Sequence, residues 1–355
     1  MKQLFSISFP LLLAFLVTFT ACSDDNESSH EEILTDIVVE IDASSLTIVK
    51  GYSALLTANV QSYEVSDFRV SWSSSNTAVA TVDNEGNVTA ISKGEAIITA
   101  TSVADRNKKA SCTVTVVNVP SETKTFTVKG VNFDMKLVEP GTFQMGNTNN
   151  YKVTISKHYY IGETEVTQAL WQAVTGYSPT DEGYSWSANP GLGNDYPAYA
   201  ISYYHVQSFL TKLNNLTGIQ FRMPTEAEWE FAARGGNKSK GYTYSGSNNV
   251  DEVAWYGDNS DYKIHPVKTK APNELGIYDM SGNVMEWCSD WFDDYPHYAV
   301  TDPTGPTSGS ARILRGGDYL MGEEWCRTYF RAYTTEPSDH FSEFGFRLAC
   351  PAILP

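Results

Sequence analysis

Alternating apolar and polar positions dominate residues 36–118 of the chain. The alternation is clearest at residues 37–41, 46–49, 79–82, 96–100 and 113–116. It is the pattern of strands that bury one face. Turn-forming sequences separate these segments, among them Lys50-Gly51 and Asn84-Glu85-Gly86. Many short strands joined by regular turns predict an all-β sandwich.

Residues 126–355 follow a different pattern, in which apolar residues recur at helical spacing in three segments. We predict helices from Thr167 to about Thr175, from Ser202 to about Leu216, and from Thr225 to Arg234. Each begins at a serine or threonine that can cap it, and glycine follows each one. The rest is irregular and rich in Gly, Tyr, Asn and Trp, so this part is expected to be a loop-rich α+β domain.

The N-terminus has the pattern of an export signal. Lys2 precedes a mostly apolar run from Leu4 to Thr20, which is short for a membrane-spanning helix and is followed at once by Cys22. We assign residues 1–21 to a signal peptide and residues 22–35, which are poor in apolar side chains, to a flexible tether. Residues 119–125 are the expected linker between domains at 36–118 and 126–355.

Two short sequences around Cys22 resemble those of bacterial lipoproteins. Residues 19–22 (FTAC) resemble a lipobox, which implies that Cys22 is lipidated and anchors the chain in a membrane. An ordinary signal peptide cleaved nearby is the alternative. Residues 23–27 (SDDNE) resemble the acidic export tag of Bacteroidota lipoproteins. The resemblance implies an outer-membrane lipoprotein exposed at the cell surface, or otherwise a periplasmic one.

The charge balance narrows the possible partners. The chain has 25 basic and 42 acidic residues, a formal net charge of -17. A nucleic acid or an anionic membrane surface needs a basic face, so neither is an expected partner. No apolar run of 20 residues follows the signal, so the mature chain is expected to be soluble apart from its lipid.

The first domain resembles the bacterial immunoglobulin-like group 2 domain. The resemblance rests on residues 70–76, 79–83 and 86–90, and it implies a spacer or adhesion module. Trp72 is expected to be a core residue. Cys112 lies in a predicted strand and is expected to be a buried thiol.

The loop at residues 276–287 has neither a helical nor a strand period. Asp279 and Glu286 supply hard oxygen donors, and the carbonyls around Gly282 and Val284 lie between them. This combination suits calcium, which takes six to eight oxygen ligands. A tight turn with two exposed acids is the alternative.

Five blocks, in order from about Phe126 to the C-terminus, resemble the formylglycine-generating enzyme (sulfatase-modifying factor) family. They lie at residues 138–146, 222–230, 276–287, 315–317 and 345–347. The resemblance implies a divergent C-type-lectin-like α+β fold. It also implies a structural calcium held by Asp279, the carbonyls of Gly282 and Val284, and Glu286.

The same resemblance implies where catalysis would occur. The family's enzymes oxidise a substrate cysteine to formylglycine, using oxygen and a copper ion held by two cysteines. Cys326 falls on the second of these, Met321 falls on the first, and Asp318 falls where the enzymes keep a serine. Thiolates select Cu(I), whereas a thioether is neutral and weaker. We therefore expect no copper and no formylglycine formation, with Cys326 as the one candidate catalytic residue.

The C-terminal cysteines leave two readings open. In an oxidising compartment a Cys288–Cys326 disulfide is plausible, and it would remove Cys326 from any copper site. A free, buried Cys326 is the alternative. The sequence does not fix the pairing among Cys288, Cys326 and Cys350.

Two classes of function fit these features. In the first, the domain is a non-catalytic module for a protein or glycan ligand, because aromatic side chains suit recognition surfaces. The candidate contacts are Tyr319, Met321, Glu323, Trp325 and Tyr329. In the second, it is a formylglycine-generating oxidase or another oxidase on the same fold. A component of a surface assembly is a third reading. Arg347 is expected to be a structural ion-pair partner.

Overall fold

The computed structural model describes residues 37–62, 65–147, 151–177, 186–187 and 189–353, and the expected signal peptide and tether, with Cys22, lie outside these residues. The chain divides into two compact units between Val119 and Pro120. Each unit has its own hydrophobic core.

The first unit is made of strands, in agreement with the alternating pattern. They are β1 (Val38–Ile41), β2 (Ser45–Val49), β3 (Ser53–Leu55), β4 (Ala58–Gln61), β5 (Val70–Ser74), β6 (Ala80–Val82), β7 (Asn87–Ala90), β8 (Gly94–Ser102) and β9 (Lys109–Val117). They form sheets of order β2-β9-β8-β5, β3-β7-β6 and β1-β4.

The core of this unit follows directly from strand alternation. Ile98 of β8 and Cys112 of β9 are opposite each other in the register and are both fully buried. Cys112 is thus the buried thiol that the sequence predicts. Trp72 is only half-buried and packs against the edge of this core, so its assignment as a core residue is confirmed in part.

The second unit combines short strands with three main helices. The strands are β10 (Thr123–Val128), β11 (Val131–Val138), β12 (Gly141–Gln144), β13 (Lys152–Ile155), β14 (Tyr159–Gly162), β15 (Met285–Trp291), β16 (Val300–Thr301), β17 (Arg312–Arg315), β18 (Arg331–Thr335), β19 (Phe344–Gly345) and β20 (Ala349–Pro351). The helices are α1 (Gln168–Thr175), α2 (Tyr203–Thr217), α3 (Glu226–Ala233) and the short α4 (Val250–Val253), with 3-10 turns η2 (Gly236–Lys238) and η3 (Glu323–Cys326).

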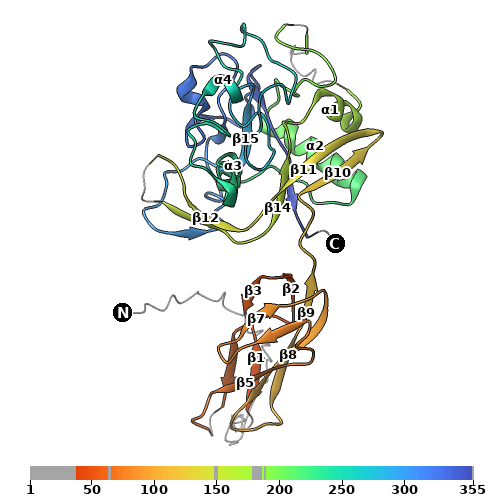
Figure 1. Ribbon diagram of the computed structural model, residues 1–355, viewed down its shortest axis with the longest axis vertical. Coiled ribbons are helices and arrows are strands. Elements are labelled where there is room, and N and C mark those ends of the chain that lie inside the picture. The colour runs from red at the N-terminus through yellow and green to blue at the C-terminus, as the bar shows by residue number, and fades with distance from the viewer. Residues whose placement is uncertain (1–36, 63–64, 148–150, 178–185, 188, 354–355) are drawn as a thin grey trace, which may run out of the picture. The chain divides into compact units, whose positions relative to one another are not determined.

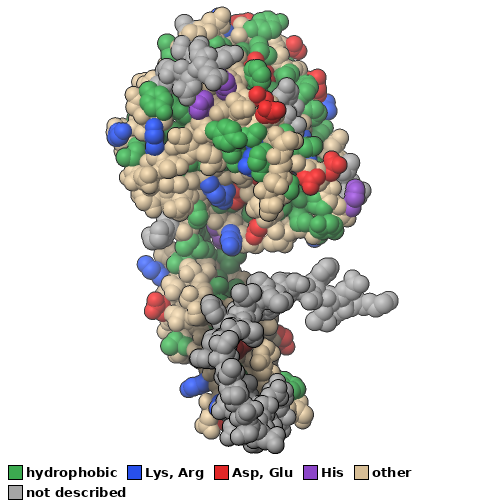
Figure 2. Space-filling view, turned by 180° about the vertical axis from the view of Figure 1, so that it is seen from behind, with side chains coloured by type: hydrophobic (Ala, Val, Ile, Leu, Met, Phe, Trp, Pro, Cys, Tyr) green, Lys and Arg blue, Asp and Glu red, His purple; other side chains and the backbone are tan. Residues whose placement is uncertain are grey.

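The strands of this unit form three small sheets, of order β10-β11-β14-β20, β12-β13-β16 and β18-β17-β15-β19. Helices α1 and α2 contact each other, and α1 also packs on β10 and β11, whereas α3 packs on β13, β15 and β17 (Figure 1). Long loops between α3 and β15 connect these layers. On the face in Figure 2, hydrophobic side chains of this unit form several separate groups among charged and polar ones.

The three main helices begin where the sequence predicts. Thr167, Ser202 and Thr225 cap α1, α2 and α3 with their side-chain hydroxyls. Thr225 and Glu228 form a full capping box, which satisfies two backbone N–H groups at the start of α3. The four-residue helix α4 was not predicted, because it is too short to show a period. Within the described residues, no helix has the length and apolar character needed to cross a membrane.

Candidate functional site

A buried ion pair connects the loop at 276–287 to the last strands. Arg347 donates from Nη2 to Glu286 Oε1 and from Nε to Glu286 Oε2, each at 2.5 Å. The indole of Trp229 donates to the same Oε2 at 2.7 Å. All three side chains are buried. Arg347 is therefore the structural ion-pair partner that the sequence predicts.

These contacts bear on the calcium prediction. Both carboxylate oxygens of Glu286 accept hydrogen bonds, but Oε1 accepts only the one from Arg347 and keeps a lone pair available to a calcium ion. Asp279 is buried and accepts one hydrogen bond at Oδ2, from the Lys268 N–H at 2.8 Å. Burial raises the pKa of Asp279 to about 6. Calcium held by Asp279, the carbonyls of Gly282 and Val284, and Glu286 stays a prediction.

The loop backbone is fixed by close contacts. Gly282 has a φ of +78°, and a Cβ at this position would lie 2.2 Å from the carbonyl oxygen of Trp255. Only glycine fits here. The next residue, Asn283, accepts a hydrogen bond at its carbonyl from the Tyr319 N–H at 3.0 Å. The loop therefore positions the segment that follows Gly317.

A third carboxylate lies beside this loop without a cation of its own. Glu165 is buried and accepts at Oε1 from the Asn283 side chain at 3.1 Å. Its Oε2 has no hydrogen-bond partner among the described residues. Burial, with the nearby charges of Asp279 and Glu286, raises the pKa of Glu165 well above its usual range. Three carboxylates, those of Glu165, Asp279 and Glu286, therefore lie near the one guanidinium of Arg347.

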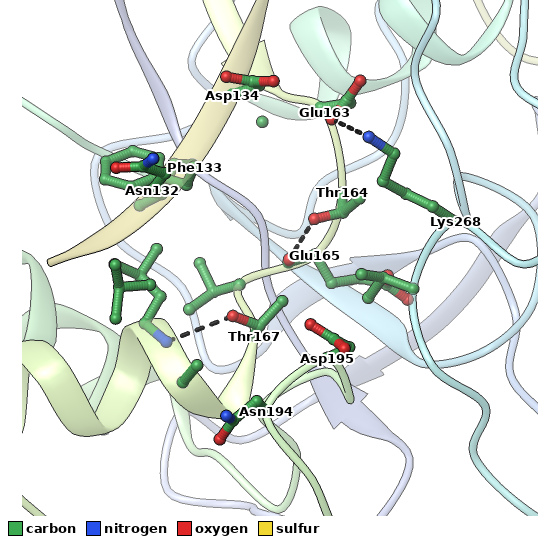
Figure 3. A pocket seen from close by; sticks show the side chains of 17 residues that line it. Asn132, Phe133, Asp134, Glu163, Thr164, Glu165, Thr167, Asn194, Asp195 and Lys268 are labelled. Atoms are coloured by element: carbon green, nitrogen blue, oxygen red, sulfur yellow. Dashed lines mark hydrogen bonds and ion pairs between the residues drawn. The ribbon is translucent and has the colours of Figure 1, made fainter. Parts of the chain in front are cut away.

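Glu165 also belongs to the wall of a cavity of about 270 Å³ between β11, β14 and the start of α1. Figure 3 shows Glu163 in its ion pair with Lys268, with Asp134 on the same side of the cavity and Asp195 on the far side. Lys136 also pairs with Glu163, at 3.1 Å. The two lysines balance much of the acidity of this wall.

The segment after Gly316-Gly317 holds the residues that the sequence singles out for catalysis. Gly317 has a φ of +71°, and a Cβ there would lie 2.9 Å from the carbonyl of Trp325, so the segment folds back tightly on η3. Cys326 ends η3 and is fully buried. Its thiol lies in a small apolar cluster with Tyr244, Val250, Val253, Ala254 and Tyr256.

The chemical state of Cys326 follows from this burial. Burial raises the pKa of the Cys326 thiol well above its usual range, and the charge of Asp318 raises it further. Asp318 is itself buried and accepts at Oδ1 from the N–H groups of Leu320 and Met321. Its Oδ2 has no hydrogen-bond partner among the described residues, and burial raises the pKa of Asp318 to about 6.

The structure alters one of the ligand-contact assignments made from sequence. Tyr319 is almost fully buried in the main core and cannot display its ring to a ligand, so it is removed from the candidate contacts. Met321, Trp325 and Tyr329 are half-buried and Glu323 is exposed. The Trp325 ring contacts Phe330 edge-on at a centroid distance of 4.9 Å. These four residues stay candidate contacts.

The predicted disulfide between Cys288 and Cys326 is absent from the described chain. Cys112, Cys288, Cys326 and Cys350 are all free and buried. Cys288 packs in a cluster with α3 residues, whereas Cys326 packs against α4 and its neighbours. Separate clusters keep the two thiols apart, so the alternative reading, a free and buried Cys326, is the correct one.

Sequence reasoning missed a second set of buried charges on α3. Glu226 and Glu230 are both buried; Glu230 pairs with Arg315, and Glu226 accepts two hydrogen bonds from Arg331 at 2.6 and 2.7 Å. The available signal was that the apolar residues of α3 (EAEWEFAA) do not gather on one face but are interleaved with glutamates, and the helix is buried on nearly all sides. Such a helix is buried, and acids within it require basic partners.

Comparison with known proteins shows which families the two units belong to. Residues 120–352 match the model of the sulfatase-modifying factor enzyme 1-like domain. The chain belongs to this family. Residues 38–114 match the model of the bacterial Ig-like domain (group 2). Both resemblances drawn from the sequence, and the fold class that they imply, are thus confirmed.

Curated relatives of this family member differ in their names. The chain is 37% identical over 235 residues to a protein named chaperone protein LppX from Paenibacillus barcinonensis, covering 54% of this chain and 80% of that one. It is 38% identical over 154 residues to the formylglycine-generating enzyme of Streptomyces coelicolor, covering 38% of this chain. The chain spans about half of that enzyme's length, 48%.

Solved structures support the family fold. Variable protein 1 of Treponema denticola is 34% identical, with a TM-score of 0.59 over 65% of this chain and 99% of that one. PvdO from Pseudomonas aeruginosa is 26% identical, with a TM-score of 0.55 over 66% of this chain and all of that one. Both likenesses extend over about the length of the second unit.

In this member of the sulfatase-modifying factor family, the donor set does not fit the copper site of the enzymes. Cys326 is a buried thiol with a raised pKa. Met321 packs against the main core, whereas Cys326 packs in the separate small cluster. A Cu(I) site needs thiolates that converge on one point. At these two positions the described residues supply one buried thiol and one neutral thioether in place of two thiolates.

Proposed function

We propose that this protein is a surface-anchored lipoprotein whose sulfatase-modifying-factor-like domain is a non-catalytic module that binds a protein or a glycan. The observation that carries the proposal is the state of Cys326, a buried thiol whose pKa burial raises and whose expected copper partner is Met321. The reactive form of a cysteine is the thiolate, and this environment suppresses it.

Sequence features support display at the cell surface. The lipobox-like residues 19–22, with Cys22 as the lipidated residue, and the acidic residues 23–27 precede an immunoglobulin-like unit. The chain's -17 net charge argues against adsorption to nucleic acid or anionic lipid. Two relatives, the chaperone protein LppX and variable protein 1, carry names that do not describe an oxidase.

The half-buried side chains after Gly317 are candidate contacts of such a module. Trp325 and Tyr329 present part of their rings, Met321 is also half-buried, and Glu323 is exposed beside them. Aromatic rings supply large contact area at low cost in conformational entropy. Calcium at the 276–287 loop is proposed as a structural ion that would hold this segment through Asn283 and Tyr319.

The second candidate function is a formylglycine-generating oxidase, which oxidises a sulfatase cysteine with copper and oxygen, or another oxidase on the same fold. The observation that favours it is the 38% identity to the Streptomyces coelicolor enzyme. Cys326 would then be the catalytic residue, and Asp318, with its free Oδ2, would be the neighbouring proton acceptor.

The two functions are separated by one assay. The full chain is loaded with Cu(I), given a Cys-x-Pro-x-Arg peptide under oxygen, and the peptide is followed by mass spectrometry for conversion of cysteine to an aldehyde. The Cys326→Ala variant serves as the matched control. We expect no aldehyde and less than one copper per chain. Aldehyde that disappears in Cys326→Ala would overturn the binding-module proposal.

A binding readout completes the test. The wild-type chain and the Trp325→Ala variant are applied to an immobilised glycan panel. We expect a glycan signal that weakens in Trp325→Ala, because the half-buried ring forms part of the contact. A signal that is unchanged in the variant would place the ligand elsewhere on the domain.

A further inference from the structure

A second cavity, of about 370 Å³, lies between the start of α3 and the strands β15, β16 and β18. Its wall includes four aromatic and several acidic side chains, for which the sequence suggested no role. The aromatic residues are Tyr151, Trp291, Tyr295 and Tyr298. A concave site of this size with a few convergent polar groups is the usual form of a small-ligand pocket.

The single basic residue in the wall, Arg331, is already engaged. Its Nε and Nη2 donate to the two oxygens of Glu226, at 2.7 and 2.6 Å, and its Nη1 donates to the carbonyl of Asp293 at 2.5 Å. The Tyr295 hydroxyl also donates to Glu226, at 3.1 Å. Each guanidinium nitrogen thus has an acceptor, and the cavity offers poor recognition to an anion.

One carboxylate oxygen in the wall accepts no hydrogen bond from the described residues. Asp290 is only 4% exposed, and its Oδ2 accepts from the Glu226 N–H and the Ser289 hydroxyl, each at 3.0 Å. Within the described part of the chain, no hydrogen bond engages Asp290 Oδ1. Gly305, also in the wall, packs beside this side chain, and a Cβ there would lie 3.1 Å from Asp290 Cβ. Asp290 lines the cavity, so its Oδ1 is available to accept a hydrogen bond from a ligand.

The mouth of the cavity adds negative charge and an open aromatic face. Asp293 and Asp294 line it and are both exposed. Asp293 accepts at Oδ1 from the Asp294 N–H at 2.9 Å, and neither carboxylate forms a salt bridge within the described residues. Tyr298 is 69% exposed, so its ring face is accessible at the same opening.

We propose that this cavity binds the protonated amine of a small organic ligand, such as an amino sugar or a lysine side chain. The ammonium group would donate to Asp290 Oδ1, with Asp293 and Asp294 attracting it to the mouth. Tyr298 would cover it with an aromatic face, since cations are attracted to the centre of an aromatic ring. No group of three metal-ligating side chains occurs among the described residues, which favours an organic cation over a metal ion.

An amine site would give the binding module proposed above its class of ligand. Only the biological role of the site rests on that proposed function. None of the residues around Cys326 takes part. An oxidase result in the aldehyde assay would therefore leave the amine site standing, and failure of the amine site would leave the assignment of Cys326 unchanged.

The test is isothermal titration calorimetry of the full chain with D-glucosamine, with Nα-acetyl-lysine methylamide, and with D-glucose as the uncharged control. We expect an amine to bind and glucose not to bind. Whichever amine binds more tightly identifies the source as a sugar or a peptide side chain. Equal affinity for glucose and glucosamine, or no heat from either amine up to roughly millimolar concentration, would overturn the proposal.

Three variants locate the site. Above about pH 7, where Asp290 is ionised, Asp290→Asn keeps the volume and one acceptor oxygen but removes the charge. Affinity for the amine should then fall about 10- to 100-fold, the range for a hydrogen bond to a charged group. Tyr298→Ala should weaken binding about two- to fivefold, as expected for an exposed cation–π contact. Tyr204→Ala, an equally simple loss of an exposed ring on α2, should have no effect.

Folding of each variant is checked by its thermal unfolding midpoint. If Asp290→Asn does not fold, the exposed Asp294→Asn variant replaces it and should lower the affinity, more strongly at low salt because the contact is at the surface. Wild-type affinity in both Asp294→Asn and Tyr298→Ala would overturn the proposed position of the amine.

Discussion

Glu286 and Arg347 form a fully buried, bidentate ion pair between residues that are 61 positions apart in the sequence. The pair ties the 276–287 loop to the segment before β20, and Trp229 of α3 adds a third contact. Three elements of the second unit therefore meet at one carboxylate.

The first prediction concerns the stability that this pair provides. Replacing Arg347 by Met leaves Glu286 buried without a cation, which should lower the free energy of unfolding by about 3–5 kcal/mol. Urea unfolding of the full chain, followed by tryptophan fluorescence, measures the change. Lys238→Met, which removes the largely exposed pair with Glu122, is the matched control and should cost about 0–1 kcal/mol. Equal effects of the two substitutions would contradict the structural role of Arg347.

The second prediction concerns pH. Burial raises the pKa of Asp290 from 3.8 to about 7, with Glu226 contributing, and raises that of Asp318 to about 6. The folded protein therefore holds protons that the unfolded chain has already released. The free energy of unfolding should fall as pH rises from about 4 to 7, by up to about 1.4 kcal/mol per pH unit for each group.

Unfolding in urea at pH 5, 6, 7 and 8 tests this dependence. Asp290→Asn should flatten the slope between about pH 5 and 7, because asparagine does not titrate. Asp258→Asn, at an exposed position, should leave the slope as in the wild type. A slope in Asp290→Asn that matches the wild type would show that Asp290 is ionised throughout this range.

The third prediction concerns the cysteines. Burial raises the pKa of the thiols of Cys288, Cys326 and Cys350 above their usual range. These thiols and that of Cys112 should therefore react slowly with a thiol-specific disulfide reagent in the folded protein and quickly in guanidinium. The count of reactive thiols before and after unfolding measures this. Rapid reaction of Cys326 in the folded state, located by peptide mapping, would contradict its burial.

The fourth prediction concerns calcium. If the ion binds at Asp279 and the loop carbonyls, adding calcium at about 100 times its dissociation constant should stabilise the fold by about 2.7 kcal/mol. A thermal shift between chelated and calcium-loaded protein measures this. Asp279→Asn keeps a residue that tolerates the φ of +57° and should remove the shift, whereas Asp258→Asn should keep it. An unchanged midpoint in the wild type would eliminate the calcium site.

Local sequence was sufficient for much of the fold. The caps at Thr167, Ser202 and Thr225 act on backbone groups within three residues, so they are readable in the chain itself. The alternation of apolar and polar residues at 96–100 and 113–116 likewise depends on near neighbours in the chain, and it predicted which side chains form the core of the first unit. The ordered motifs of the second unit were also sufficient to reveal its family and fold class.

The site could be predicted only in part, because its contacts are long-range. The sequence shows that Glu286 is a carboxylate of the loop, and only the folded structure shows that Arg347 and Trp229 donate hydrogen bonds to it. Tyr319 lies in a segment that suits display, but the backbone bond to Asn283 draws it into the core.

By itself, the sequence determined where elements begin, which faces are apolar, and that Met321 stands where a copper cysteine is expected. The tertiary structure alone decided which charges are neutralised, which thiols are sealed from water, and which carboxylate oxygens, among them Glu165 Oε2 and Asp318 Oδ2, accept no hydrogen bond from the described residues. Periodicity and capping depend on neighbours a few residues away, whereas burial and pairing depend on residues that only folding brings together.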